Sequence, residues 1–279
     1  MKKIVYDGQF FNIKDTLTCG QVFRFLPFKN GYLIKTMDRC AYVYQDNQNA
    51  VIEGDEKDEK YFYNYFDLDR DYNKIYTDCH NENVDILTIS ANAGKGIRIL
   101  NQDKNETAFS FIISQNNNIP RIKSTIEKLC LGLGDKKTFM GEEYYAFPSY
   151  EKIANATLEF LREIGLGYRA EYIKCFAESI VNGLSLESLS GLSTPDLKKN
   201  LISMHGIGPK VADCITLFAF HRSDSFPVDT WIEKVYREDL KGTLKDRGKI
   251  SDELVKKFGE NAGYYQQYLF YYKRSIENK

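Results

Sequence analysis

The stretch Leu201–Tyr236 reads LISMHGIGPKVADCITLFAFHRSDSFPVDTWIEKVY and carries the most specific pattern of the chain. Gly206 and Gly208 allow a tight turn with positive φ, and Pro209 suits the first turn of a new helix. Lys210 is therefore predicted at a helix N-terminus. Because the helix dipole and partial burial both disfavour an ammonium there, we expect Lys210 to be neutral often enough to act as a nucleophile.

A Pro-Val-Asp triplet follows the hairpin and ends the loop HRSDSFPVD. This combination resembles the signature of the helix-hairpin-helix glycosylases of base-excision repair. The matching residues are Gly206, Gly208, Lys210, Pro227, Val228 and Asp229. The resemblance implies that the hairpin amides hold a DNA phosphate and that Lys210 attacks the sugar C1′ to form a Schiff base. It also implies that Asp229 orients the reaction and steadies the developing positive charge.

Both residues have simpler alternatives. A lysine at the start of a helix, such as Lys210, is usually a solvated surface charge. Asp229 and Thr230 are favoured helix caps, and Thr230 with Glu233 is predicted to form a capping box that opens the helix WIEKVYREDL. Capping and catalysis by Asp229 are compatible.

The N-terminal segment FFNIKDTLTCGQVFRF contains Gly20-Gln21 and Phe23-Arg24. It resembles the strand and turn that open the 8-oxoguanine DNA glycosylases, a narrower group within the superfamily. The resemblance implies that the Gly20 carbonyl accepts the N7 hydrogen, which oxidised guanine has and normal guanine lacks. A buried group left unpaired costs roughly 1–3 kcal/mol, which is enough to reject the undamaged base. The alternative is an ordinary glycine at a strand end.

The C-terminal segment AGYYQQYLFYYKRS places Gln266 and Phe270 four residues apart, on one helix face. It resembles the last helix of the same glycosylases. The resemblance implies that Gln266 reads the Watson–Crick edge of the extruded base while Phe270 stacks on its ring. Cys214, one turn after Lys210, is implied to cover the other side of the purine. The alternative is that Cys214 and Phe270 are plain core residues.

A third segment, FSFIISQNNNIPRIKSTIEKLC, has two apolar helical runs interrupted by three asparagines and restarted by a proline. It matches the same group, as does EIGLGYRAEY. The resemblance implies that Asn116 fills the space left by the flipped nucleotide and that Arg121 and Arg169 donate to the unpaired cytosine, with Tyr168 wedged beside it. The alternative is that the asparagines cap a helix junction and the arginines contact phosphate or water.

The resemblance spans the chain from Phe10 to Phe270. It departs from the group at Trp231, where animal and fungal members usually carry a histidine that contacts a phosphate. The indole N–H of Trp231 is a donor but has no cationic form, so we expect this contact to be weaker or differently made.

Composition excludes several other classes. The six cysteines are scattered without a CxxC pair, so neither a disulfide framework nor a metal site is expected, and an iron–sulfur cluster after Cys214 is excluded. The chemistry is expected to need no cofactor. No signal peptide or membrane span is seen, so we expect a cytoplasmic, nucleoid-associated monomer that binds no membrane. The formal net charge is −1, but residues 53–85 carry eleven acidic and four basic residues, so the rest of the chain is positive. That acidic segment is interpreted as a solvated linker and helix facing away from DNA.

The expected fold is α+β, with an N-terminal antiparallel β-sheet domain and two mostly helical lobes that contain a helix-hairpin-helix motif. The predicted boundaries are residues 1–103 for the sheet domain, residues 104–122 with 211–279 for one lobe, and residues 123–210 for the other. Helical periodicity dominates from about residue 83 onward.

The predicted function is that of a bifunctional DNA glycosylase and AP lyase. The protein would excise 8-oxoguanine, preferentially opposite cytosine, from double-stranded DNA. Two alternatives remain open. One is a helix-hairpin-helix glycosylase for other damaged purines, and the other is a DNA-binding module without catalysis.

Overall fold

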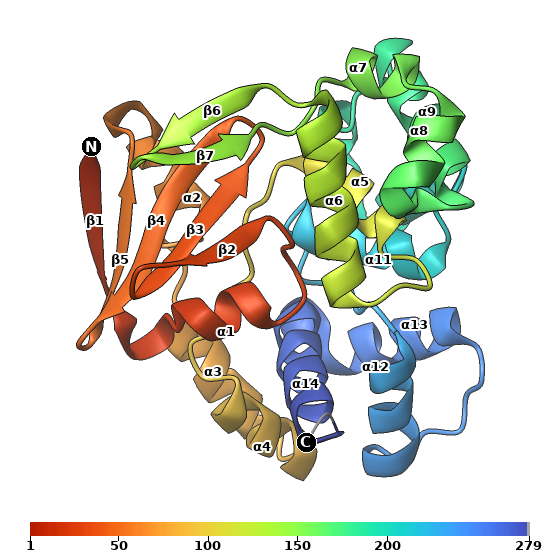
Figure 1. Ribbon diagram of the computed structural model, residues 1–279. Helices are drawn as coiled ribbons and strands as arrows, with labels where there is room; N and C mark the ends of the chain where they lie inside the picture. The colour runs from red at the N-terminus through yellow and green to blue at the C-terminus, as the bar shows by residue number, and fades with distance from the viewer. Residues whose placement is uncertain (278–279) are drawn as a thin grey trace.

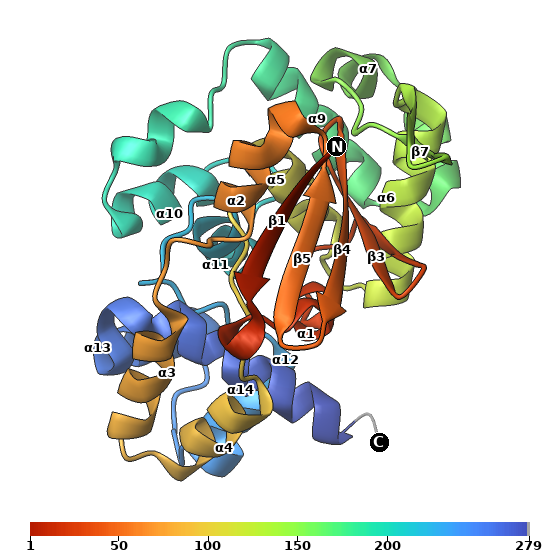
Figure 2. The same ribbon diagram turned by 90° about the vertical axis from the view of Figure 1, so that its left-hand side faces the viewer.

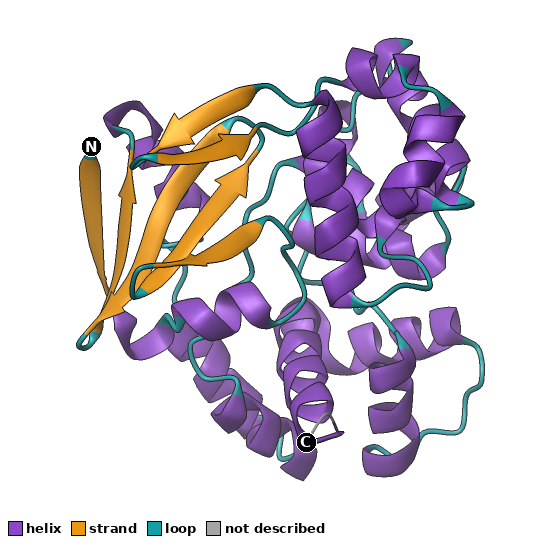
Figure 3. Cartoon of the chain, in the orientation of Figure 1, coloured by secondary structure: helices purple, strands orange, loops and turns teal. Residues whose placement is uncertain are grey.

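Alternating apolar and polar residues near the N-terminus form a five-stranded antiparallel sheet of order β1-β5-β4-β3-β2. The computed structural model describes residues 1–277. The strands are β1 (Lys2–Asp7), β2 (Phe25–Phe28), β3 (Gly31–Thr36), β4 (Arg39–Asp46) and β5 (Asn49–Gly54). Two short helices accompany this sheet, α1 (Ile13–Thr18) and α2 (Glu59–Tyr65). The sheet lies beside two groups of helices, as Figures 1 and 3 show.

A second hairpin, β6 (Lys136–Phe139) and β7 (Glu142–Tyr145), interrupts the region predicted to be helical. Its two-residue turn, Met140-Gly141, has positive φ at both positions, as a type I′ turn requires. Phe139 and Tyr144 pack on Tyr42 of the main sheet, so the central strands are buried on both faces. The prediction that helical periodicity dominates from about residue 83 did not include this hairpin, because its strands are too short to show a clear period.

The upper group of helices in Figure 1 surrounds α5 and α11. It contains α5 (Lys104–Ile113), α6 (Ile119–Leu133), α7 (Tyr150–Asn155), α8 (Leu158–Leu161), α9 (Arg169–Val181), α10 (Thr194–Ile202) and α11 (Pro209–Phe218). Asn118 caps α6 by accepting from the Arg121 backbone N–H at 3.0 Å. The asparagine run thus separates two helices, as predicted.

The lower group of helices packs around the C-terminal helix (Figures 1 and 2). It contains α3 (Tyr72–Asn81), α4 (Asp85–Ala93), α12 (Thr230–Lys234), α13 (Arg247–Phe258) and α14 (Ala262–Glu277). The helices α3 and α4 belong to the predicted N-terminal domain of residues 1–103, and α4 packs against α14 of the C-terminal lobe. In the part of the chain that the structure describes, no helix has both the length and the apolar character needed to cross a membrane.

The acidic segment is less solvated than the sequence suggested. Asp58 is buried and pairs with Arg39 at 2.9 Å, and Asp67 is buried and pairs with Arg70 at 2.7 Å. Both carboxylates have a cationic partner, which is the usual condition for burying an acidic side chain. The interpretation of this segment as a solvated linker was therefore wrong at these two positions.

A buried ion pair connects the sheet domain to α5. Arg24 is 1% exposed and its Nη1 donates to Glu106 Oε1 at 3.2 Å. Glu106 also accepts from the Met37 backbone N–H, and Arg24 Nη2 donates to the Tyr145 carbonyl at 2.5 Å. These contacts fix the N-terminal end of α5, and the other end of that helix carries residues of the site described next.

Candidate active site

The hairpin between α10 and α11 has the conformation that its glycines allow. Gly206 adopts φ +84°, and a Cβ there would lie 2.5 Å from the Tyr172 ring. Gly208 is the N-cap of α11 with φ −87°, and nothing lies within 4 Å of the position its Cβ would take. The first-turn N–H groups of α11 have no partner within the helix and begin at this open space, which suits an anion.

Gln115 connects the hairpin to the turn that contains Asn116, Asn117 and Asn118, which we call the asparagine turn. Its Nε2 donates to the Gly206 carbonyl at 2.8 Å. Arg169 is buried and its Nε donates to the Gln115 carbonyl at 2.6 Å, while its Nη2 donates to the Asn116 carbonyl at 2.9 Å. Gln115 therefore links two segments that are about ninety residues apart in the sequence, a role that the sequence patterns did not reveal.

Lys210 lies on the first turn of α11, as predicted, and borders two adjoining hollows. An open cleft of about 470 Å³ is lined by residues from both helical lobes and from the Gly20 turn. These residues include Gly20, Phe23, Phe111, Ser114, Asn117, Asn118, Lys210, Asp229, Trp231, Phe270 and Arg274. A smaller cavity of about 50 Å³ is lined by Gly20, Phe111, Lys210, Cys214, Phe218, Pro227, Asp229, Gln266, Gln267 and Phe270. The predicted catalytic and base-binding residues thus converge on one place.

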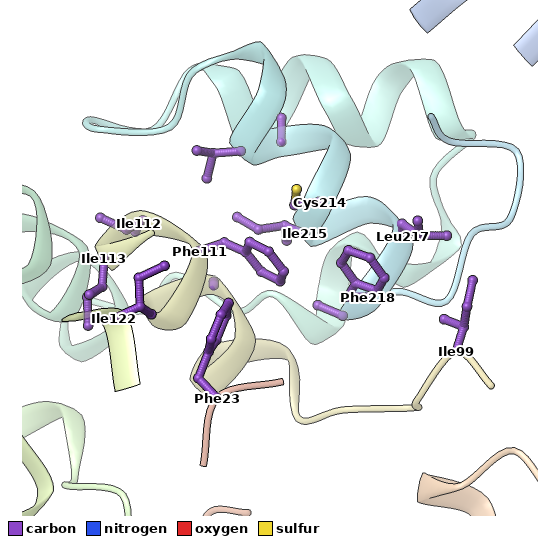
Figure 4. Close-up of a cluster of buried hydrophobic side chains, with 14 of the residues drawn as sticks. Phe23, Ile99, Phe111, Ile112, Ile113, Ile122, Cys214, Ile215, Leu217 and Phe218 are labelled. Atoms are coloured by element: carbon purple, nitrogen blue, oxygen red, sulfur yellow. The ribbon is translucent and has the colours of Figure 1, made fainter. Parts of the chain in front are cut away.

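The wall of this cavity is apolar and aromatic. Phe111 of α5 stacks on Phe218 of α11 with ring centres 5.3 Å apart, and Phe23 meets Phe111 edge-on at 5.8 Å. Figure 4 shows these rings beside Cys214, which projects from α11. Lys210 Nζ lies 5.5 Å from the centre of the Phe111 ring. The amine is therefore held against an apolar surface instead of extending into solvent.

The protonation of Lys210 differs from the prediction. Burial by itself lowers the pKa of Lys210, but Cys214 and Asp229 raise it, and it ends above its ordinary value of 10.5. Burial raises the pKa of the Cys214 thiol to about 11, so Cys214 is uncharged at neutral pH. The Asp229 carboxylate, which lines the same cavity, is then a nearby negative charge that favours the ammonium. The prediction of an often neutral lysine was wrong for the DNA-free protein, because it considered the helix end without Asp229.

Asp229 is the N-cap of α12. Its Oδ1 accepts from the backbone N–H groups of Trp231 at 3.0 Å and Ile232 at 2.9 Å. The predicted capping box of Thr230 and Glu233 does not form, because Asp229 takes the cap position and the Glu233 carboxylate pairs with two arginines, Arg237 and Arg247. Burial raises the pKa of Asp229, although these N–H groups and Lys210 oppose that shift.

Side chains of α14 hold the Gly20 turn in place. Arg274 Nη2 donates to the Thr18 carbonyl at 2.6 Å, and Gln267 Nε2 donates to the Cys19 carbonyl at 2.9 Å. Gly20 follows with φ +91°, and a Cβ there would lie 3.2 Å from the Phe270 ring. These hydrogen bonds therefore fix the position of the Gly20 turn relative to Phe270.

Gln266 is also set within the cavity. Its Nε2 donates to the Pro227 carbonyl at 3.1 Å. Its Oε1 is buried and has no hydrogen-bond partner among residues 1–277. A buried acceptor without a partner is uncommon in folded proteins, and it suits a ligand that brings a donor.

Most of the residues predicted to contact the opposite base lie around Asn116, which precedes the cleft residues Asn117 and Asn118. Asn116 has φ +45°, and its Nδ2 donates to the Tyr168 hydroxyl at 3.2 Å. Both side chains are exposed, as is Arg121 on the first turn of α6. Arg169, by contrast, is buried beneath the turn, where its donors are used by backbone carbonyls.

Arg274 lines the cleft but was not singled out in the sequence. It follows Gln266 and Phe270 at a spacing of four residues, so helical periodicity places all three on one face of α14. That spacing was a signal available in the sequence. Trp231 lies at the edge of the same cleft, with Lys234 Nζ 5.0 Å from its ring.

Comparisons with known proteins agree with this geometry. Residues 3–108 match the family model of the 8-oxoguanine DNA glycosylase N-terminal domain. Residues 109–260 match the model of the HhH-GPD superfamily of base excision DNA repair proteins, which is the class that the hairpin, lysine and aspartate define. The chain belongs to the 8-oxoguanine DNA glycosylase family within that superfamily.

Individual relatives support the same assignment. The N-glycosylase/DNA lyase of Saccharomyces cerevisiae is 31% identical, covering 92% of this chain and 82% of the yeast protein. A probable N-glycosylase/DNA lyase of Methanothermobacter thermautotrophicus is also 31% identical, covering 75% of this chain and 72% of its own. A crystal structure of the Clostridium acetobutylicum 8-oxoguanine glycosylase/lyase, bound to duplex DNA with cytosine opposite 8-oxoguanine, superposes with a TM-score of 0.91. It is 37% identical and covers 96% of this chain and 93% of that one.

Proposed function

We propose that this protein excises 8-oxoguanine from duplex DNA as a bifunctional DNA glycosylase and AP lyase in base-excision repair. One observation carries the proposal: Lys210 and Asp229 line the same cavity as Gly20, Gln266 and Phe270. A nucleophile, a carboxylate and groups suited to a purine are thus brought together from three distant parts of the chain.

Lys210 is the proposed nucleophile. After losing a proton, its amine attacks C1′ of the damaged nucleotide, and the glycosidic bond breaks with its electron pair leaving on the base. The C1′–O4′ bond then breaks and O4′ takes up the proton released by the amine, so that the sugar ring opens and an imine joins Lys210 to C1′. The imine makes a C2′ proton acidic and permits elimination of the 3′ phosphate. The Asp229 carboxylate stabilises the positive charge that develops at the sugar.

The cavity in the DNA-free protein is too small for a purine, so it must widen to admit a base that has been flipped out of the duplex. Its volume of about 50 Å³ has room for about one or two water molecules. Phe270 is only partly buried, so its ring is the wall that can move to admit a purine between itself and Cys214. The Gly20 carbonyl then accepts the N7 hydrogen and Gln266 contacts the Watson–Crick edge.

DNA binding uses two further groups of residues. The open space at Gly208 accepts a backbone phosphate at the N-terminus of α11, and Trp231 offers its indole N–H at the edge of the cleft. Asn116 and Tyr168 fill the space in the duplex, and Arg121 donates to the opposite cytosine. Arg169 supports the asparagine turn by donating to the Gln115 and Asn116 carbonyls. To contact cytosine, it would have to give up these hydrogen bonds and donate to the base instead.

The protein is proposed to act as a monomer, and in the cytoplasm, where it reaches the nucleoid. Size-exclusion chromatography with light scattering tests the oligomeric state. A dimer that persists on dilution would contradict it.

Substrate specificity is the direct test of the proposed function. Single-turnover rates are measured on duplexes that carry 8-oxoguanine opposite each normal base, and on a duplex that carries 7-methylguanine opposite cytosine. We expect 8-oxoguanine opposite cytosine to be released fastest. Release of 7-methylguanine without release of 8-oxoguanine would contradict the proposal and favour a glycosylase for other damaged purines.

A further inference from the structure

Arg274 has a buried donor that the protein leaves unused. Its Nη2 donates to the Thr18 carbonyl at 2.6 Å, and its guanidinium carbon lies 5.0 Å from the centre of the Phe270 ring. Within residues 1–277, its Nη1 is buried and has no hydrogen-bond partner. Leaving a charged donor unpaired in a buried place is costly, so an unpaired guanidinium N–H in a cavity wall suits a ligand acceptor.

The position of this donor is defined by Gly20. A Cβ on Gly20 would lie 3.1 Å from Arg274 Nη1 and 3.2 Å from the Phe270 ring. Nη1 is therefore next to the Gly20 turn and close to the ring on which a base would stack. The unpaired acceptor Gln266 Oε1 belongs to the adjoining small cavity. Unpaired groups of opposite kinds thus lie in two adjoining hollows that share Gly20 and Phe270.

The chemistry of the lesion matches this placement. In 8-oxoguanine the N7–H donor and the O8 acceptor are on adjacent ring atoms, whereas guanine has a bare N7 and a hydrogen on C8. A group that binds O8 must therefore lie beside the group that accepts the N7 hydrogen. Arg274 Nη1 meets this requirement, because it lies beside Gly20.

We propose that Arg274 is a specificity-determining residue whose Nη1 donates a hydrogen bond to O8 of the flipped base. This inference rests on the proposed function and deepens it. The Gly20 carbonyl and the Arg274 guanidinium together read both atoms that oxidation changes, and the guanidinium bond is charge-assisted. Because the base departs with the electron pair of the glycosidic bond, the cation beside O8 also stabilises the leaving group.

The test compares two substrates that differ at one atom. Wild type, Arg274→Met and Arg274→Lys are assayed under single turnover on duplexes carrying 8-oxoguanine or 8-thioguanine opposite cytosine. Both bases keep the N7 hydrogen, but sulfur is a weak acceptor. We expect Arg274→Met to slow 8-oxoguanine release by about tenfold to a hundredfold, while 8-thioguanine release changes much less, and Arg274→Lys to restore part of the loss.

Two controls separate this role from a structural one. Strand cleavage at a preformed abasic site needs Lys210 but no base, so Arg274→Met should leave it nearly unchanged. Arg237→Met removes an exposed arginine whose one acidic partner among residues 1–277 is Glu233 at 2.6 Å, and it should change the release rate of neither substrate. Equal slowing of both substrates by Arg274→Met would overturn the proposal, because it would mean that Arg274 only supports the Gly20 turn through Thr18.

Failure of the inference and failure of the proposed function give different results. If wild type releases 8-oxoguanine and Arg274→Met does so at the same rate, the role of Arg274 is wrong and the function stands. If wild type releases no 8-oxoguanine, both are wrong.

Discussion

The two hairpin glycines should fail in different ways when each is replaced by alanine. At Gly206, φ is +84° and a Cβ would lie 2.5 Å from Cγ and 2.6 Å from Cβ of Tyr172. The left-handed conformation costs an L-residue about 1–2 kcal/mol, and relieving the overlap costs about 1–3 kcal/mol. Gly206→Ala should therefore lower the free energy of unfolding by roughly 2–5 kcal/mol.

Gly208→Ala is the matched variant. Gly208 has φ −87°, and nothing lies within 4 Å of its added Cβ, so folding should change by less than about 1 kcal/mol. The methyl group would instead occupy the open space proposed for a DNA phosphate. Loss of a charge-assisted contact there should weaken DNA binding by about tenfold.

Urea denaturation measures the first effect, and titration of a duplex carrying an uncleavable abasic-site analogue measures the second. The two variants should differ in what they lose. Gly206→Ala should lose stability, whereas Gly208→Ala should lose affinity for DNA and keep normal stability. If Gly208→Ala binds the duplex as tightly as wild type, the proposed phosphate site is in the wrong place. If Gly206→Ala unfolds at the wild-type urea concentration, the strain argument fails.

Three other perturbations follow from the site and its supports. Asp229→Asn should keep the α12 cap, because asparagine caps a helix as well as aspartate does. It should nevertheless slow base release on the order of a hundredfold in single-turnover assays. A much smaller effect would mean that the negative charge of Asp229 does not contribute to base release. Glu106→Gln should leave the Arg24 cation buried without its partner and lower the free energy of unfolding by roughly 3 kcal/mol in urea titrations, whereas unchanged stability would contradict the ion-pair account. Because the pKa of Lys210 lies above its ordinary value and only the neutral amine attacks, borohydride trapping at a preformed abasic site should accelerate from about pH 6 to about pH 9. A rate that is flat across this range would mean that proton loss from Lys210 does not limit imine formation.

Local patterns in the sequence were sufficient to place the main parts of the site. The Gly206 hairpin and Lys210 on the first turn of α11 follow from glycine, proline and helix-end preferences. Gln266 and Phe270 share a face because they are four residues apart on α14. Sequence similarity then joined these segments, since periodicity alone does not bring distant elements together.

Features that depend on contacts between distant segments were missed. The protonation of Lys210 depends on Asp229, which follows a different loop in the sequence but lines the same cavity. Arg169 was expected to donate to the unpaired cytosine, but its Nε donates to the Gln115 carbonyl instead. The β6–β7 hairpin forms because Phe139 has a sheet to cover, and no local pattern contains that information.

The central claim is that Lys210 is the nucleophile, and trapping of the covalent intermediate tests it most directly. Wild type, Lys210→Gln and Lys199→Gln are incubated with a duplex carrying 8-oxoguanine opposite cytosine, and borohydride is added. Lys199 is an exposed lysine on the adjacent helix α10 and serves as the matched control. We expect a stable protein–DNA adduct in wild type and Lys199→Gln, and none in Lys210→Gln. An adduct that persists in Lys210→Gln, or that is absent from wild type, would contradict it.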